Sequence, residues 1–385
     1  MSTRVYLDHN ATSPLRPEAR AEMLNALETI GNPSSVHAEG RAAKALLEDA
    51  RSVVARAVGA PRRSVVFTSG ATEAASLALS PALRREGDEA PIDVLLIGAG
   101  EHLCVLQGHR FPLAAVESIP LTREGVISLE ALEAALARHS GKRAMLALQA
   151  VNNETGVIQP VAEAAALIHG AHGVVVCDAV QSVGRLGTTF ATTGADILFF
   201  SSHKLGGPMG VGALAFSDES LHLEAPMLRG GGQEFGRRAG TENVAGIAGF
   251  AAALRAATAD LAKEAARLAD LRDALEREVL KVAPEARFYG LRGPRAPNAS
   301  AFAIPGLAPR IMLMAFDLEN VALSAGSACS SGKMMESHVL TAMAATDKEA
   351  LRASFGWSST QEDVEQFGKV LARVVDRMRS RHSAA

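Results

Sequence analysis

The sequence predicts an α/β protein whose larger part is a mostly parallel sheet covered by helices, with a smaller α+β part beside it. Three observations support this prediction. Apolar runs of strand length alternate with helical patterns between residues 64 and 216, which is typical of parallel sheets with helices on both faces. The later part of the chain instead mixes longer helical patterns with short strands. With 385 residues, the chain is also too long for one core of usual size.

The first elements are recognised by their end signals. Residues 5–8 favour an extended segment, Pro17 suits the first turn of a helix that ends near Ile30, and a second helix ends at Gly59. The alternating region follows. Its expected strands end near residues 67, 98, 121, 148, 177, 200 and 216, and its helices begin near residues 71, 102, 128 and 161.

A long helical pattern runs from about Val244 to Val282, and we place the change of domain within it. We therefore expect a large domain over residues 16–255 and a small domain made of residues 1–15 and 256–385. In the small domain we expect strands near 301–304 and 321–323, and helices near 310–318, 337–345 and 360–377.

Composition excludes several classes of function. Acidic and basic side chains nearly balance, at 42 against 39, and no long basic block occurs, so we expect no direct contact with nucleic acid. The apolar runs are far shorter than the roughly 20 residues of a membrane span, and residues 1–6 lack the apolar region of a signal peptide. Three cysteines leave one unpaired however they combine, which favours a reducing compartment and a cytoplasmic protein.

One lysine stands between an apolar strand and a glycine-rich turn. Lys204 follows the apolar run 195–200, so it lies at the carboxyl end of a buried strand, where open α/β sheets bind ligands. A lysine that reaches solvent from a loop is the commoner outcome at such a position. The residues at the other strand ends decide between the two interpretations.

Two other strand ends carry polar groups that suit one ligand. Residues 68–73 follow a strand and open a helix, so their N–H groups and hydroxyls could bind a phosphate or simply cap the helix. Asp178 ends another strand and could bind a protonated ring nitrogen or cap a helix, with Gln181 on the same side. An amine for a Schiff base, a carboxylate for a pyridine nitrogen and a helix terminus for a phosphate are the groups that pyridoxal phosphate requires.

Three further residues could contact a cofactor or a substrate. His102 comes just after a strand and could stack on a ring or carry protons, or bind only the backbone. Asn153 lies in an Asn-Asn turn at the end of another strand. Arg352, in a strand-like segment, could bind a carboxylate with two hydrogen bonds or form a surface ion pair.

Cys329 lies in a run of small residues, 324–333, that has no apolar periodicity, so we expect an exposed loop and an available thiol. Cys177, within an apolar strand, is expected to be a small buried side chain, and we interpret Cys104 as structural. No two cysteines have the spacing of a zinc-ligand pair, and we expect no metal site.

With these motifs assembled, the chain resembles the cysteine desulfurases, pyridoxal-phosphate enzymes of the class V aminotransferase group. The resemblance implies the fold type I architecture, in which the mostly parallel sheet of the large domain has seven strands and the small domain carries the catalytic cysteine on a long loop. It runs nearly end to end, through Tyr6-Leu7-Asp8, Gly31-Asn32-Pro33-Ser34-Ser35, Thr68-Ser69-Gly70-Ala71-Thr72-Glu73, Glu101-His102, Asn152-Asn153-Glu154-Thr155-Gly156, Asp178-Ala179-Val180-Gln181, Ser202-His203-Lys204, Arg238-Ala239-Gly240-Thr241 and Gly326-Ser327-Ala328-Cys329.

The resemblance also implies a role for each matching residue. Lys204 would form the Schiff base with pyridoxal phosphate, Cys329 would be the sulfur nucleophile, and His102 would stack on the cofactor ring as the third catalytic residue. The cofactor-binding set would be Gly70, Ala71, Thr72, His102, Asp178, Gln181, Ser201, His203, Lys204 and, reaching the neighbouring subunit of a homodimer, Thr241. The residues around the substrate carboxylate would be Asn32, Asn153 and Arg352.

The activity implied is the conversion of L-cysteine to L-alanine, with sulfur left on Cys329 as a persulfide for an acceptor protein such as an iron-sulfur scaffold. Two alternatives remain, a related lyase that prefers selenocysteine and a non-catalytic paralogue that acts as a binding partner in sulfur transfer. The chain departs from the family pattern at Gly100, Met209, Ala325 and Trp357. None of these departures removes a residue that the resemblance names as catalytic.

Overall fold

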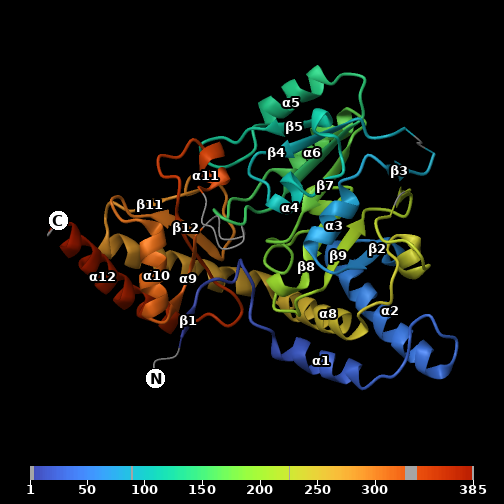
Figure 1. Ribbon diagram of the computed structural model, residues 1–385, viewed down its shortest axis with the longest axis horizontal. Helices are drawn as coiled ribbons and strands as arrows, with labels where there is room; N and C mark the ends of the chain where they lie inside the picture. Colours follow the sequence, from blue (N-terminus) through green and yellow to red (C-terminus); the bar gives the residue numbers. More distant parts are fainter. Residues whose placement is uncertain (1–3, 88–89, 225, 326–335, 384–385) are drawn as a thin grey trace.

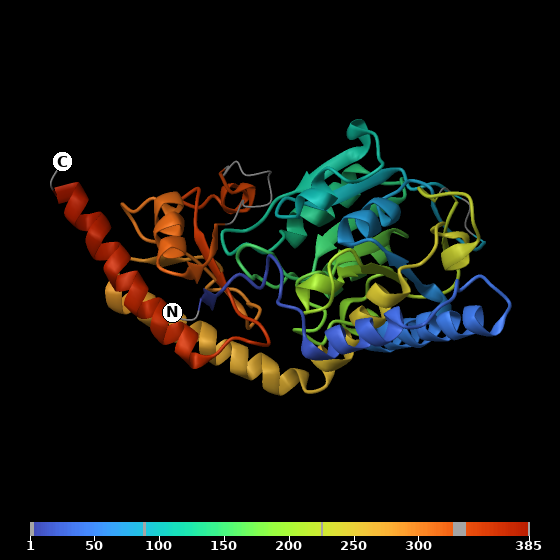
Figure 2. The same cartoon turned by 60° about the horizontal axis from the view of Figure 1, so that its bottom comes forward.

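The chain forms two lobes, and the N-terminal segment runs between them (Figure 1). The computed structural model describes residues 4–87, 90–224, 226–325 and 336–383. The larger lobe holds the central sheet, and the smaller lobe holds the last third of the chain together with β1 (Val5–Tyr6). Figure 2 shows α9 (Leu261–Val282) leading from the large lobe along the small one, where it packs against α12 (Gln361–Ser383).

Seven strands form the central sheet, in the order β2-β9-β8-β7-β6-β4-β5. The strands from β8 to β5 are parallel neighbours, whereas β9 is antiparallel to both β2 and β8. The predicted mostly parallel, seven-stranded sheet is therefore confirmed. The strands are β2 (Val65–Thr68), β4 (Val94–Gly98), β5 (Val116–Ile119), β6 (Ala144–Gln149), β7 (Val174–Asp178), β8 (Ile197–Ser201) and β9 (Gly212–Phe216).

Helices cover both faces of this sheet because its strands are apolar on both sides. In β4, Leu96 belongs to the core on one face, whereas Leu95 and Ile97 belong to the core on the other. The first core also contains residues of α2 (Ala38–Val58), α5 (Leu129–Arg138), α6 (Val161–Gly170) and α8 (Val244–Thr258), and the second contains residues of α3 (Ala71–Ala78) and α4 (Leu103–Leu106). Helix α1 (Pro17–Leu27) packs on α8.

The small lobe is built on an antiparallel sheet in the order β11-β12-β15-β14. Its core includes Val5 and Leu7, because β1 pairs in parallel with β13 (Val321–Ala322). The division of the chain into residues 16–255 and residues 1–15 with 256–385 remains our proposal for its folding units. The other elements of this lobe are β11 (Arg287–Phe288), β12 (Ala299–Ala303), β14 (Ser324–Ala325), β15 (Leu351–Ser354), α10 (Pro309–Leu318) and α11 (His338–Ala342).

Two features differ from the expected elements. The helical pattern from 244 to 282 forms two helices, α8 and α9, which meet at a bend of 76°. No glycine or proline marks the break at Ala259 and Asp260, so apolar spacing by itself predicts one helix. A two-stranded sheet of β3 (Leu83–Arg85) and β10 (Leu221–Leu223) also lies in stretches where the sequence shows no strand pattern.

The described residues contain no single helix with both the length and the apolar character needed to cross a membrane, and α8 and α9 pass that test only as a bent pair. Within the same residues, no group of three or more His, Cys, Asp or Glu is arranged to hold a metal ion. Cys104 and Cys177 are buried free thiols.

Candidate active site

One cavity collects the residues that follow five strands of the central sheet. Because β2 and β8 are both antiparallel to β9, the carboxyl ends of β2, β4, β6, β7 and β8 meet at one edge. The cavity at this edge has a volume of about 620 Å³. The predicted site residues in its lining are Gly70, Ala71, Thr72, His102, Asn153, Asp178, Gln181, Ser201, His203, Lys204 and Arg352.

Lys204 ends the short 3-10 turn that follows β8. Its Nζ donates to the carbonyl oxygens of Asn10 and Ala11 at 2.6 and 2.8 Å, across from the strand end. The carbonyl oxygen of Lys204 accepts from Ser13 Oγ at 3.0 Å and from Arg185 Nη2 at 2.9 Å. The lysine is therefore held within the site at both its side chain and its backbone, and the interpretation as a solvated loop lysine does not apply.

Asp178 is the last residue of β7 and only 6% exposed. Its Oδ1 accepts the N–H of Val180 at 2.9 Å. Burial raises the pKa of this carboxyl to about 6, although the Val180 N–H and the charge of Lys204 act in the opposite direction. Burial removes the water that would stabilise the charged carboxylate. A protonated ring nitrogen beside it would stabilise that charge instead, so the carboxylate suits such a partner.

His102 and His203 are both in the neutral form at pH 7. Burial, followed by the charge of Lys204, lowers the pKa of each imidazole to about 4. Nδ1 of His102 accepts the N–H of Cys104 at 3.1 Å, so the ring hydrogen is on Nε2. Nδ1 of His203 lies 3.1 Å from Thr12 Oγ1. A neutral imidazole can stack on an aromatic ring without bringing a charge into the cavity.

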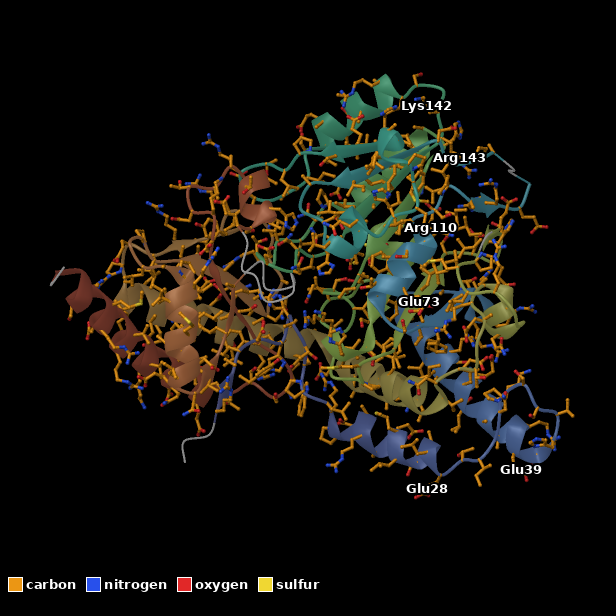
Figure 3. The ribbon with its side chains drawn as sticks, viewed as in Figure 1. Glu28, Glu39, Glu73, Arg110, Lys142 and Arg143 are labelled. Atoms are coloured by element: carbon orange, nitrogen blue, oxygen red, sulfur yellow. The ribbon has the colours of Figure 1, made fainter. Side chains whose placement is uncertain are left out.

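The turn after β2 presents backbone N–H groups at the start of α3. Gly70 is the N-cap, so no side chain of the described residues caps this helix. Glu73, which Figure 3 labels on α3, stabilises the turn: its carboxylate accepts from the Ser69 N–H at 2.7 Å and from Arg238 Nε at 2.9 Å. Uncapped N–H groups and the positive helix end suit a phosphate.

Arg352 brings a guanidinium from the small lobe and is only 5% exposed. Its Nη1 donates to the Asn153 carbonyl oxygen at 2.9 Å, and its Nη2 donates to Asp8 Oδ1 at 2.8 Å. Its Nε is buried without a hydrogen-bond acceptor among the described residues. This unused donor belongs to a side chain that lines the cavity, which suits an anionic ligand group.

Two predicted residues lie away from this cavity, and a third lies outside the described residues. Asn32 is exposed in the loop after α1, where its Oδ1 accepts the Ser34 N–H at 2.9 Å. Thr241 is exposed and lines a separate cavity of about 100 Å³, which adjoins the large one at Ser69. Cys329 is not among the described residues, which end at 325 and resume at 336.

Asn10 does not lie at a strand end of the central sheet, but it contacts several groups of the site. Its carbonyl oxygen accepts from Lys204 Nζ and from Gln181 Nε2, the latter at 3.0 Å. Its Oδ1 accepts from Arg185 Nη1 at 2.9 Å and from Asn298 Nδ2 at 3.0 Å. The sequence marks Asn10 only as a turn residue after a short extended segment, because its partners are distant along the chain.

Glu101 is a second residue near the site for which the sequence predicts no role. It is fully buried, and its Oε1 accepts the Gln149 N–H at 2.6 Å. Oε2 has no hydrogen-bond partner among the described residues. Burial, followed by the charge of Asp178, raises the pKa of Glu101 well above its usual range. The carboxyl group is therefore neutral over a wider range of pH than an exposed glutamic acid.

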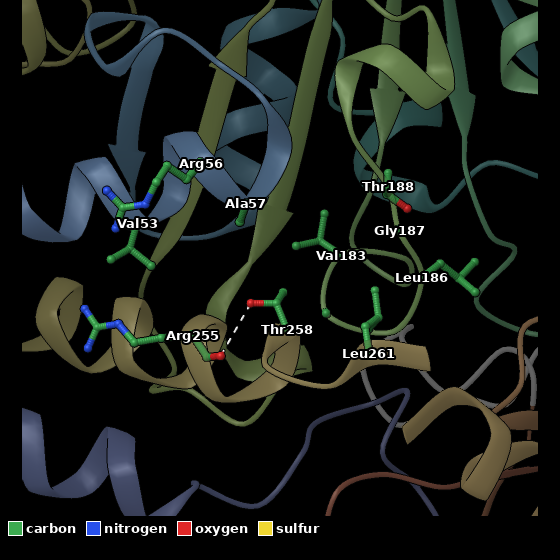
Figure 4. A pocket seen from close by; sticks show the side chains of 11 residues that line it. Val53, Arg56, Ala57, Val183, Leu186, Gly187, Thr188, Arg255, Thr258 and Leu261 are labelled. Carbon is green, nitrogen blue, oxygen red and sulfur yellow. Dashed lines mark hydrogen bonds between the residues drawn. The ribbon is translucent and has the colours of Figure 1, made fainter. Parts of the chain in front are cut away.

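Another cavity, of about 350 Å³, lies between α2, α8 and the loop after β7 (Figure 4). Its walls are mainly apolar, and Arg56 and Arg255 are its charged residues. Thr258 Oγ1, in its lining, bonds the Arg255 carbonyl oxygen at 3.4 Å. No predicted site residue lines this cavity. The large cavity at the sheet edge is therefore the better candidate for the active site.

The groups of the large cavity fit a phosphorylated pyridine aldehyde. An amine, a buried carboxylate whose Oδ1 accepts a backbone N–H, a neutral imidazole and uncapped helix N–H groups all face one volume. Each matches a different part of pyridoxal phosphate: the aldehyde, the ring nitrogen, the ring face and the phosphate.

Comparisons with known proteins identify the family of this chain. The aminotransferase class-V family model matches residues 5–367. The chain is 36% identical to "Cysteine desulfurase IscS" of Dictyoglomus turgidum, over 99% of this chain and 96% of that protein, and 38% identical to a cysteine desulfurase of Cereibacter sphaeroides, over 98% and 97%. A solved structure of a NifS-like protein from Rickettsia africae superposes with a TM-score of 0.86 at 31% identity and covers 97% of this chain and 100% of that one.

Proposed function

This chain belongs to the aminotransferase class-V family, and we propose that it is a pyridoxal-phosphate-dependent cysteine desulfurase that converts L-cysteine to L-alanine. The observation that carries the proposal is the meeting of Lys204, Asp178, His102 and Arg352 at one cavity. The first three come from separate strand ends of the central sheet, and Arg352 comes from β15 of the small lobe. Curated relatives with the name cysteine desulfurase support the same activity over nearly the whole chain.

Most of the predicted residues line the large cavity and would hold the cofactor there. The Lys204 amine would bind its aldehyde carbon, Asp178 its ring nitrogen and Gln181 its ring hydroxyl. The N–H groups at Gly70, Ala71 and Thr72, with Ser201 and His203, would hold the phosphate. When bound, pyridoxal phosphate supplies an electron sink for the charge that develops at the substrate Cα.

The chain's own groups would position the substrate and move its proton. Arg352 would bind the carboxylate of L-cysteine through its guanidinium, beside Asn153. The Lys204 amine would accept the Cα proton of the substrate on Nζ. His102 would cover the ring face as a neutral imidazole with its hydrogen on Nε2.

Sulfur transfer requires a second nucleophile, and we assign it to Cys329. One L-cysteine and one enzyme thiol give one L-alanine and one enzyme persulfide: a sulfur–sulfur bond forms on Cys329 Sγ, the carbon–sulfur bond of the substrate breaks, and the carbon receives a hydrogen. The thiolate is the attacking form. The persulfide would then pass to an acceptor protein, such as an iron-sulfur scaffold.

We further propose a homodimer, in which Thr241 and Asn32 have roles that the single chain does not give them. Thr241 would reach the phosphate of the neighbouring subunit, and Asn32 would lie near the substrate carboxylate. A cytoplasmic location fits Cys104 and Cys177, which are free thiols and not members of a disulfide.

The test is turnover of L-cysteine by the purified protein supplied with pyridoxal phosphate. Alanine should appear together with a mass increase of one sulfur atom on the Cys329 peptide. Lys204→Ala should abolish alanine formation, whereas Cys329→Ser should retain the visible absorption of the bound cofactor but lose the persulfide.

Each alternative predicts another result. Alanine formation from selenocysteine but not from cysteine, and without need of Cys329, would identify a selenocysteine lyase. Absence of both products and of a cofactor absorption band would exclude the enzyme and leave a non-catalytic binding protein.

A further inference from the structure

A buried arginine without a carboxylate partner lies behind the site. Arg185 belongs to the loop after β7 and is 6% exposed. Its loop neighbours, Val183 and Leu186, line the 350 Å³ cavity of Figure 4. The guanidinium of Arg185 instead contacts the N-terminal segment and the turn of Lys204. The loop therefore separates an apolar cavity on one side from the candidate active site on the other.

Four oxygen atoms accept hydrogen bonds from this guanidinium. Nη1 donates to Asn10 Oδ1 at 2.9 Å and to Gln181 Oε1, and Nη2 donates to the carbonyl oxygens of His9 and Lys204 at 3.0 and 2.9 Å. None of these acceptors is a carboxylate. Burial, followed by the charge of Arg352, lowers the pKa of Arg185 to about 9. The guanidinium is thus a buried cation, still mostly protonated at neutral pH, whose partners are all uncharged.

These contacts set the orientation of the Gln181 amide. Because Oε1 accepts from Arg185, the other end of the amide must be the donor, and Nε2 does donate to the Asn10 carbonyl oxygen at 3.0 Å. The reversed amide would place an N–H₂ group against the guanidinium. Arg185 therefore determines which end of the Gln181 amide contacts Asn10.

Arg185 and the Lys204 amine bind the same residue, Asn10. The two cations share Asn10, since Lys204 Nζ binds its carbonyl oxygen and Arg185 Nη1 binds its side chain. A nearby like charge disfavours the protonated amine, which is how some enzymes obtain a reactive lysine.

The other charged groups around the lysine act in both directions. Asp178 and the carbonyl oxygens that bind Nζ favour the ammonium. Arg352 is paired with Asp8. His9 and His203 are neutral, because burial and adjacent cations lower their pKa values to about 3 and about 4. Arg185 is then a nearby cation that is paired with no carboxylate among the residues that the structure describes, as is Arg16, whose Nε donates to the Leu205 carbonyl oxygen at 2.9 Å.

We propose that Arg185 is a positioning residue of this site, which orients the Gln181 amide and the Lys204 turn and whose buried charge favours the uncharged Lys204 amine. The inference rests on the proposed function for the role of Lys204. It concerns the chain's own residues, so it can be measured in the protein without cofactor or cysteine.

The test is competitive labelling of the cofactor-free protein with acetic anhydride at a series of pH values. Mass spectrometry of the peptide that contains Lys204 gives the pH at which half of the amine becomes reactive. In Arg185→Gln this midpoint should rise by roughly one pH unit or more, because the like charge is removed. In Arg185→Lys, which keeps the charge, the midpoint should stay near that of the wild type.

Arg272→Gln is the matched control, because Arg272 also donates to a carbonyl oxygen, that of Ala296 at 2.9 Å, but on the small lobe. Its Lys204 midpoint should not change. A folded Arg185→Gln protein with an unchanged midpoint would overturn the proposal. Should Arg185→Gln fail to fold, the wild type decides: a Lys204 midpoint at or above the ordinary lysine value of about 10.4 would also overturn it.

These outcomes are independent of whether the protein desulfurates cysteine. A protein that forms no alanine would disprove the proposed function and leave the Lys204 midpoint as measured. Conversely, an active desulfurase with an ordinary Lys204 midpoint would disprove only the role of Arg185.

Discussion

Asp178 and Glu101 are two buried carboxyl groups at the same edge of the sheet, with different partners. Asp178 accepts a backbone N–H and lines the cavity, whereas Glu101 lies behind it with one oxygen unpartnered among the described residues. Burial raises the pKa of both, and the charge of Asp178 also raises that of Glu101. One carboxyl group is thus suited to bind a cation, and the other is suited to remain neutral.

Asp178→Asn should weaken pyridoxal phosphate binding roughly 10- to 100-fold, because a hydrogen bond to a charged group is worth about 1.5–3 kcal/mol. Fluorescence titration of the cofactor-free protein measures this change. Asp93→Asn is the control, because Asp93 precedes β4 at the opposite edge of the sheet and accepts only the Arg143 backbone N–H, at 2.8 Å, among the bonds described for its side chain. Equal loss of affinity in both variants would argue against a specific role of Asp178.

Glu101→Gln should stabilise the cofactor-free protein at pH 7 to 8, and the gain should shrink as the pH falls toward 5. The pKa of Glu101 is raised in the folded protein. The stability that this carboxyl group contributes is therefore fully present when the pH is below its pKa in the unfolded chain, and it is lost as the pH rises through its pKa in the folded protein. A neutral glutamine does not have this loss. Thermal unfolding midpoints between pH 5 and 8 measure the effect.

Glu133→Gln, on the exposed side of α5, provides the comparison for this series. Its difference from the wild type should be small and nearly constant with pH. A stability difference for Glu101→Gln that does not depend on pH would contradict the assignment of a raised pKa.

At the scale of the element, helix ends are where sequence and conformation agree most directly. Gly59 ends α2 with φ 72° in the left-handed region, and Pro17 begins α1, as their positions in the sequence predict. The bend between α8 and α9 was not predictable in this way, because residues 258–261 contain neither glycine nor proline.

Gly59→Ala should destabilise the protein by about 1 kcal/mol, because an L side chain in the left-handed region carries that strain. Space is not the cause, since the nearest atom to an added Cβ is Thr189 Cβ at 3.9 Å. Gly170→Ala, at the end of α6, is the matched control, because Gly170 is not left-handed and an added Cβ would meet nothing within 4 Å. Urea unfolding should show a loss only for Gly59→Ala.

The parallel arrangement of the sheet explains which residues of the site could be predicted from the sequence. Asp178 ends a strand and Lys204 and His102 follow strands, and parallel strands bring their carboxyl ends to one edge of the sheet. Asn10 and Arg185 could not be found in this way, because they act through bonds to residues far along the chain. Asn10, for example, bonds to Asn298 and Ser354 of the small lobe.

At the scale of the whole molecule, the proposed homodimer makes a specific prediction for Thr241. Lys204→Ala and Thr241→Val should each be nearly inactive as separate proteins. If Thr241 serves the neighbouring subunit, unfolding and refolding the two together should restore about a quarter of the wild-type activity, because half of the dimers are mixed and each has one intact site.

Two other results would contradict this arrangement. A mixture that stays inactive would place Thr241 in the site of its own chain. Full activity of Thr241→Val by itself would remove Thr241 from the site. Sedimentation of the mixture must show dimers in each case, so that failed assembly is not mistaken for either result.

The pairing of β1 with β13 has a consequence for the order in which the protein is made. Val5 is synthesised long before Val321, with which it pairs, and Asn10 bonds to Asn298 and Ser354. Domains generally fold as units while the ribosome extends the chain, but this segment must wait until most of the small lobe has emerged. A chain that stalls before residue 321 already contains Lys204 but cannot bring Asn10 to its amine in the finished arrangement. Cofactor loading should therefore follow completion of translation.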